Sequence, residues 1–168
     1  MLRPESTCHE TTAMKTALLR TTCTLLMLIS LAACINSRQP ITLVTLADGT
    51  RGLKSAVDIG PPGPSQGDLF VFDQPLMDQD RRDIGSNSGY CVSTRPGVHS
   101  QCQWTLLFFG SGGAVTGTVV VAGQELEAGK SVVAVVGSTG TYAGSTGEMS
   151  SEPNPDGTFT QTLYLVRP

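Results

Sequence analysis

Apolar and β-branched residues recur along most of the chain in short runs, and Gly-, Pro- and Ser-rich segments separate the runs. This pattern predicts β-strands joined by turns rather than helices. Eight strands are expected, at residues 41–46, 69–73, 89–95, 102–109, 114–122, 131–136, 144–151 and 158–166. Short connections in the second half favour an antiparallel meander that closes on itself. The sequence therefore predicts an all-β fold, an eight-stranded antiparallel up-and-down β-barrel.

Two polar segments interrupt this pattern. Residues 47–67 contain Gly60-Pro61-Pro62-Gly63-Pro64 and are expected to form a long loop, placed over a barrel mouth. Residues 123–130 are expected to form a polar turn. The interior of an eight-stranded barrel is just large enough for side chains or for one small ligand.

The first 34 residues have the features of a targeting segment. A basic start at Met14-Lys15 precedes an apolar run that is too short to span a bilayer, and small residues follow it. The ending Leu31-Ala32-Ala33-Cys34 resembles the lipobox of bacterial lipoproteins, which implies cleavage before Cys34 and lipidation of its sulfur. The alternatives are an ordinary cleaved signal or a buried helix. We expect an exported protein of the cell envelope, anchored to a membrane by lipid, with residues 35–40 as a tether and 41–168 as the barrel domain.

Composition excludes some kinds of partner. The net charge of the 168-residue chain is −3 and no basic run is present, so a nucleic-acid partner is not expected. His99 is the only His outside the predicted signal, so a multi-His metal site is not expected either. The acidic residues of segment 78–83 alternate as calcium ligands do, but two arginines among them favour a solvated turn. We predict no metal and no other cofactor.

Two cysteines of the predicted barrel are expected to form a disulfide. Cys91 and Cys102 remain after the signal and the lipidated cysteine are set aside, and an exported protein folds in an oxidising compartment. Their midpoint falls at Pro96-Gly97, a turn signal, so a hairpin centred there places the two cysteines opposite each other. A loop longer than two residues suits Pro-Gly better. The alternative is two buried thiols.

Several short motifs resemble one superfamily of small barrels. Residues 67–91 read Gly-Asp-x-x-x-Phe-x-x-x-Leu and later Ile-Gly-x-x-x-Gly-x-Cys, a pattern similar to plant allene oxide cyclases. Residues 71–76 resemble dirigent proteins, and residues 84–89 are similar to bacterial spirotetronate cyclases. Residues 135–142 resemble the Gly-rich turn of dirigent proteins.

The resemblance implies an antiparallel barrel with an apolar cavity, often trimeric, that works without metal or redox cofactor. Asp73 matches one of a pair of acidic residues in dirigent proteins, and Gln74 takes the place of the other. Cys91 corresponds to a cavity Cys of the plant cyclases, and Glu125 to a cavity Tyr. The first-strand Glu and Asn of those cyclases have no counterpart here. We expect Asp73, Gln74, Cys91 and Trp104 to face a ligand.

Two functions remain open at this point. One is a lipid-anchored barrel that binds a small hydrophobic molecule. The alternative is a cofactor-free cyclase, isomerase or dirigent-like protein, with Asp73 and Gln74 as catalytic or steering groups. A carboxyl of Asp73 inside an apolar lumen would have a raised pKa and could exchange a proton with a substrate. Asp73 could instead end its strand and cap the following turn.

Overall fold

The computed structural model describes residues 40–167, and every regular element in this part is a β-strand. The predicted signal, the lipidated Cys34 and nearly all of the tether lie outside the described residues. Within them, no helix is long and apolar enough to cross a membrane. The strands are β1 (Pro40–Asp48), β2 (Leu53–Val57), β3 (Leu69–Met77), β4 (Asp83–Arg95), β5 (His99–Phe109), β6 (Val115–Leu126), β7 (Ser131–Gly140), β8 (Thr146–Pro153) and β9 (Thr158–Val166).

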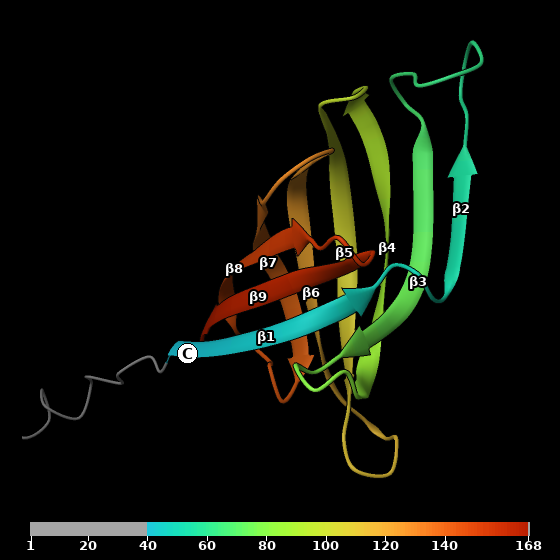
Figure 1. Cartoon of the computed structure of the whole chain (residues 1–168). Helices are drawn as coiled ribbons and strands as arrows, with labels where there is room; N and C mark the ends of the chain where they lie inside the picture. Colours follow the sequence, from blue (N-terminus) through green and yellow to red (C-terminus); the bar gives the residue numbers. More distant parts are fainter. Residues whose placement is uncertain (1–39, 168) are drawn as a thin grey trace, which may run out of the picture. The chain divides into compact units, whose positions relative to one another are not determined.

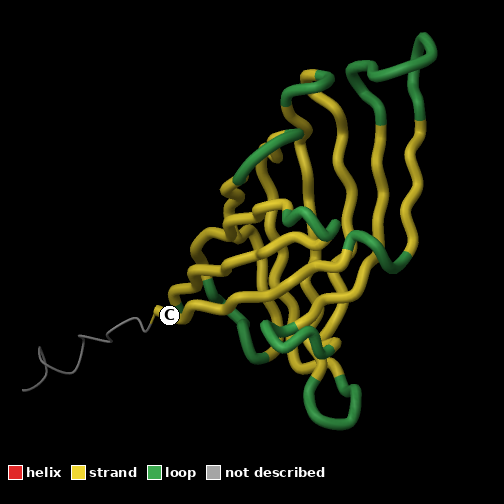
Figure 2. Tube along the Cα trace, in the orientation of Figure 1, coloured by secondary structure: helices red, strands yellow, loops and turns green. Residues whose placement is uncertain are grey.

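The strands form one antiparallel sheet that closes into a barrel (Figures 1 and 2). Their order is β1-β9-β8-β7-β6-β5-β4-β3-β2, and β1 also pairs with β3. The β1–β3 pairing consists of Leu46 opposite Met77 and Ala47 opposite Leu76. These contacts close eight strands into the predicted barrel, and β2 is an additional strand on its edge.

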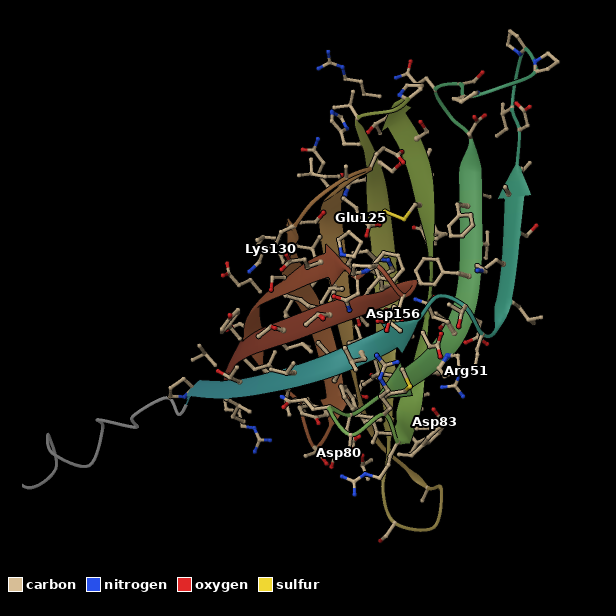
Figure 3. All side chains as sticks on the ribbon, viewed as in Figure 1. Arg51, Asp80, Asp83, Glu125, Lys130 and Asp156 are labelled. Carbon is tan, nitrogen blue, oxygen red and sulfur yellow. A yellow bond between two sulfur atoms is a disulfide. The ribbon has the colours of Figure 1, made fainter. Side chains whose placement is uncertain are left out.

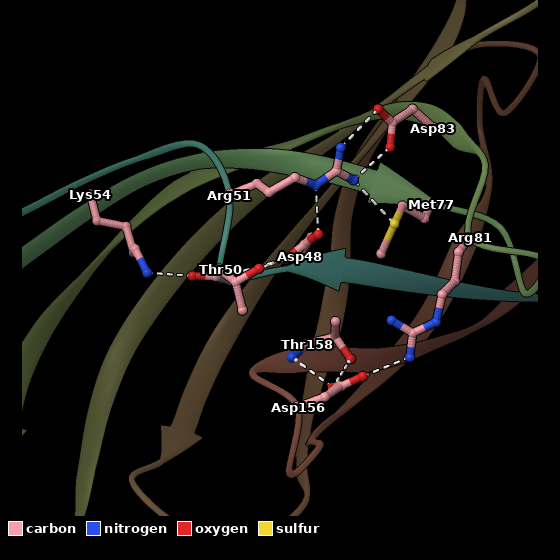
Figure 4. A network of polar contacts seen from close by, with 10 residues as sticks. Asp48, Thr50, Arg51, Lys54, Met77, Arg81, Asp83, Asp156 and Thr158 are labelled. Carbon is pink, nitrogen blue, oxygen red and sulfur yellow. Dashed lines mark hydrogen bonds and ion pairs between the residues drawn. The ribbon is translucent and has the colours of Figure 1, made fainter.

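β3 has two partners along one edge. Its second half meets β1, and its first half, Leu69–Asp73, pairs with β2. Both partners are antiparallel to β3, so β1 and β2 run in the same direction along it, with the turn at residues 49–52 between them. The Arg51 side chain stabilises this turn: its Nε lies 2.6 Å from the Asp48 carboxylate and its Nη2 lies 2.7 Å from that of Asp83 (Figure 4).

β2 corrects the prediction of an uninterrupted loop at 47–67. All five residues of Leu53-Lys54-Ser55-Ala56-Val57 are exposed, so this strand lacks the alternation that marks a half-buried strand. It forms because β3 offers it an unpaired backbone edge beyond the end of β1. The remaining residues of the segment, up to Gly67, connect β2 to β3 as a loop.

Several strands extend further than predicted. β4 begins at Asp83 instead of residue 89, and β6 continues through Leu126 where a polar turn was expected. The Gly- and Ser-rich composition at the start of β4 does not predict a strand. Its glycines are present because the neighbouring strand packs closely against them. A Cβ on Gly89 would lie 2.9 Å from Cα and from Cδ1 of Trp104 on the neighbouring strand.

The hairpin between β4 and β5 forms as predicted, with Cys91 directly opposite Cys102. The N–H of Val98 donates to the carbonyl of Arg95 at 3.0 Å, and Gly97 has φ 74°, which is a turn of the Pro-Gly type II kind. Cys91 and Cys102 form a disulfide, with Cα atoms 4.1 Å apart. The disulfide prediction is confirmed.

Apolar side chains fill the barrel near the β1–β3 closure. The most deeply buried of them are Ala47, Leu76, Leu106, Val119, Val121, Met149, Leu163 and Leu165. The inward positions change in character along β3, from Leu76 through Gln74 to Phe72 and Phe70. The barrel is therefore packed with aliphatic residues at one level, and its interior becomes polar and then aromatic away from it.

Candidate functional site

The barrel contains a cavity of about 270 Å³ beyond its packed core. The cavity is bounded by inward-facing residues of six barrel strands, by Lys54 of the edge strand β2 and by two adjoining turns. Its lining residues are Gly49, Lys54, Phe70, Phe72, Gln74, Asn87, Cys91, Trp104, Glu125, Ser151, Gly157, Phe159 and Gln161. Strand alternation explains this set, since every second residue of β3 and β4 points into the barrel.

Four aromatic side chains form the apolar wall of the cavity. Phe70 and Phe72 follow one another on the inner face of β3 and stack with ring centroids 5.9 Å apart. Trp104 is buried on β5, and Phe159 is partly buried at the start of β9. Phe70 remains 40% exposed, which places it at the mouth of the cavity.

Three amide side chains line the cavity next to the packed core. Gln74 on β3 lies directly opposite Asn87 on β4, and Gln161 projects from β9. All three are buried. Both polar atoms of Asn87, Nδ2 and Oδ1, lack a hydrogen-bond partner among the described residues, and so does Oε1 of Gln161. This end of the cavity therefore combines burial with unused hydrogen-bonding capacity.

Glu125 and the disulfide form a second polar group. The Oε2 atom of Glu125 lies 3.3 Å from Sγ of Cys102 and 3.5 Å from Sγ of Cys91 (Figure 3). Burial raises the pKa of Glu125 to about 7, and the charge of Glu127 adds to the increase. Disulfide sulfurs carry no proton, so only a protonated Glu125 can donate a hydrogen bond to them. At neutral pH this carboxyl can therefore both give and take a proton.

The cavity adjoins two outer hollows. One, of about 410 Å³, lies between the β2–β3 loop and the β4–β5 hairpin, and the other, of about 160 Å³, includes Glu125. Phe70 and Cys91 line the cavity and both hollows. A molecule that enters from this side would therefore pass the Phe70 ring and the disulfide.

The cavity brings together three of the four predicted ligand-facing residues. Gln74, Cys91 and Trp104 all line it. Asp73 does not: it is exposed on the outer face of β3, opposite Leu53 of β2. The carboxyl expected to steer a ligand thus points away from the lumen, because Gln74 and Phe72 on either side of it point inward. Asp73 does not end its strand either, since β3 continues to Met77.

Sequence reasoning gave no role to two of the three buried amides of the cavity, Asn87 and Gln161, and it reached Glu125 only through the resemblance. Asn87 lies in the Gly- and Ser-rich stretch that was expected to precede a strand, and Gln161 lies inside the last predicted strand. Glu125 was placed by the resemblance to a cavity Tyr, and the structure puts it in the cavity. Alternation along β6 would have identified it independently, because residues 119, 121, 123 and 125 share the inner face once the strand is extended.

Comparison with known proteins gives structural relatives only. No protein-family profile matches the chain, and no curated protein does. A pyocyanin demethylase superposes with a TM-score of 0.63 at 24% identity, covering 74% of this chain and 99% of that one. A pterocarpan synthase dirigent protein gives 0.62 at 16% identity, covering 77% and 89%. The Diels Alderase AbmU from Streptomyces koyangensis gives 0.56 at 18% identity, covering 98% and 84%. The chain therefore has the barrel fold that dirigent proteins and Diels-Alderases share, as the sequence motifs predicted.

Proposed function

We propose that this barrel binds a small, largely aromatic molecule in its cavity. The observation that carries the proposal is an aromatic-walled cavity beside the apolar core of the barrel. Its volume of about 270 Å³ lies just below the usual range for ligand pockets, roughly 300–1,000 Å³, so the cavity fits a small molecule. The structural relatives support a small-molecule role, since their names describe a demethylase of pyocyanin, a pterocarpan synthase and a Diels-Alderase.

The chain offers a direct reporter for this proposal. Trp104 is its only tryptophan, and it lines the cavity, so intrinsic tryptophan fluorescence monitors cavity occupancy alone. We expect saturable quenching when planar aromatic probes are titrated into the purified protein. Absence of quenching and of heat in calorimetry, across a panel of one- to three-ring probes, would contradict the proposal.

Two neighbouring residues provide a matched pair of variants. Phe70 is 40% exposed and faces the cavity, whereas Val71 is 42% exposed and faces outward. Aromatic contacts contribute about 0.5–1.5 kcal/mol, so Phe70→Ala should weaken binding about two- to tenfold. Val71→Ala should leave affinity unchanged. Equal effects of the two substitutions would place the binding site outside the cavity.

Glu125 favours a second candidate function, cofactor-free acid–base catalysis on the bound molecule. A carboxyl with a pKa of about 7 exists in both protonation states at neutral pH, as a general acid–base group requires. An isomerisation or cyclisation that moves one proton fits this single group. For any substrate found, Glu125→Gln should abolish turnover and its pH dependence near 7 while binding persists. Turnover that survives the substitution would remove Glu125 from the mechanism.

Export and lipid anchoring are also proposals, and they rest on the sequence of the first 34 residues. Cys34 would carry the lipid, and the barrel would face the periplasm or the cell exterior. Mass spectrometry of the N-terminal peptide from the membrane fraction tests this, with Cys34→Ser as the control that should release the protein. A trimer, implied by the resemblance alone, can be tested by light scattering on the barrel.

A further inference from the structure

The buried amides at the inner end of the cavity indicate what the ligand must carry. Native proteins satisfy the great majority of their buried polar atoms. Asn87 is 1% exposed and leaves both of its side-chain polar atoms without a partner. Gln161 is 2% exposed and leaves its Oε1 without one. Both side chains line the cavity. Three unused hydrogen-bonding atoms therefore belong to side chains that line one space able to admit a molecule.

The nature of these atoms restricts their partner. Nδ2 of Asn87 is a donor and needs an acceptor, whereas Oδ1 of the same amide needs a donor close by. Oε1 of Gln161 needs a second donor. Exchange of oxygen and nitrogen in the Asn87 amide would not alter this requirement, because neither atom has a partner. The complement is a planar group in which a carbonyl oxygen stands next to two N–H bonds, as in a primary carboxamide.

The charged side chains around the cavity restrict the charge that the ligand can carry. The titratable side chains that line the cavity are Lys54 and Glu125. Lys54 is exposed and donates to the carbonyl of Gly49, and Glu125 belongs with the disulfide near the mouth. Within residues 40–167, no cationic side chain therefore stands among the amides to neutralise an anionic head. The carbonyl oxygens of Asn87 and Gln161 would repel a carboxylate. A neutral head fits better than a charged one.

Resting on the proposed function, we propose that the ligand is an aromatic molecule with a neutral primary carboxamide head. The head hydrogen-bonds Asn87 and Gln161 at the inner end of the cavity. The aromatic body lies against Phe72 and Trp104. Asn87 is thus a specificity-determining residue, because it distinguishes a head that both donates and accepts from one that only accepts.

Three probes of nearly equal shape test this assignment. Naphthalene-2-carboxamide has a donor and an acceptor, methyl 2-naphthyl ketone has the acceptor alone, and naphthalene-2-carboxylate is anionic. Quenching of Trp104 gives a dissociation constant for each. We expect the carboxamide to bind at least tenfold more tightly than the ketone and the carboxylate. In Asn87→Leu, a substitution of similar shape, the ratio of carboxamide to ketone affinity should fall to about one, while ketone binding is retained or improved.

The outcomes separate the two proposals. If none of the probes binds, the proposed ligand-binding function fails, and the head-group assignment fails with it. If the probes bind without preference, prefer the carboxylate, or keep their preference in Asn87→Leu, only the assignment is overturned, and the amides then serve bound water. Gln161→Leu is the second variant if Asn87→Leu does not fold, and it should reduce the same ratio. Ser88→Ala, next to Asn87 on the other face of β4, should change nothing.

Discussion

Replacing Glu125 by Gln should stabilise the barrel, and the gain should depend on pH. The carboxyl lies in the cavity beside the disulfide, where burial and the charge of Glu127 disfavour its ionised form. The Gln side chain has nearly the same shape but carries no charge at any pH. The difference in unfolding free energy between the two proteins therefore isolates the cost of ionising this one group in the folded state.

The magnitude follows from the two pKa values. The pKa of Glu125 is about 7 in the folded protein, against 4.5 as the ordinary value. A tenfold change in acidity is about 1.4 kcal/mol, so the full cost of ionisation is about 3 kcal/mol. Because the folded pKa is raised, the cost is absent below pH 4.5, grows between pH 4.5 and 7, and is constant above pH 7. Glu125→Gln should therefore gain up to about 3 kcal/mol at pH 8 relative to its effect at pH 4.

Urea unfolding at intervals from pH 4 to pH 8, with the disulfide kept oxidised, measures this difference. Glu148→Gln is the matched control for exchanging a carboxyl for an amide, since Glu148 is exposed on β8. A flat difference for Glu125→Gln would refute the reasoning, because it would show that water or movement of the side chain solvates the carboxylate as well as in the unfolded chain.

Three further predictions concern stability. The disulfide joins two residues with a sequence separation of 11. Replacing both Cys91 and Cys102 by Ala should therefore lower the free energy of unfolding by about 3 kcal/mol, as measured with urea. An unchanged free energy of unfolding would contradict a role of the disulfide in restraining the unfolded chain. Gly89→Ala should cost about 1–3 kcal/mol, since its Cβ would meet Trp104, and an unshifted thermal midpoint would refute this. Hydrogen bonds from Thr50 and Arg51 lower the pKa of Asp48 to about 2, so Asp48→Asn should cost about 1 kcal/mol at pH 7. This loss should disappear as the pH falls from about 4 to 2, and a loss that persists at pH 2 would exclude an ionic origin.

Much of the fold could be predicted because the strands that build the closed core alternate and are rich in β-branched residues. The strands that were missed or shortened have other reasons to exist. β2 is fully exposed and forms on the free edge of β3, which no local pattern can indicate. The first half of β4 is rich in Gly and Ser. Gly85 and Gly89 are needed there because a Cβ at either position would clash with the backbone of β5. These are long-range packing requirements rather than local preferences.

The residues that line the cavity were predicted only in part, because the sequence did not show which face of β3 points inward. Gln74, Cys91 and Trp104 were expected in the cavity, and they line it. Asp73 was chosen together with Gln74 through the resemblance to dirigent proteins, but neighbouring residues of a strand face opposite sides, and Asp73 points outward. In a strand, either the odd-numbered or the even-numbered residues face the core. The sequence does not decide between the two sets when apolar residues occupy both faces. Residues 70–72 are all apolar, so the alternation gave no decision.

The pairing of β1 with β9 fixes when this molecule can finish folding. The Oγ1 atom of Thr45 on β1 donates to the carbonyl of Gln161 on β9, 116 residues later. Of the nine described strands, β1 is synthesised first and its main partner β9 last, so the barrel cannot close until β9 has emerged. Until then β1 presents an unpaired strand edge to solvent, open to the wrong neighbours. Pairing between segments so distant in sequence is a slow folding step. The nascent protein is therefore most prone to aggregation between the synthesis of β1 and its pairing with β9.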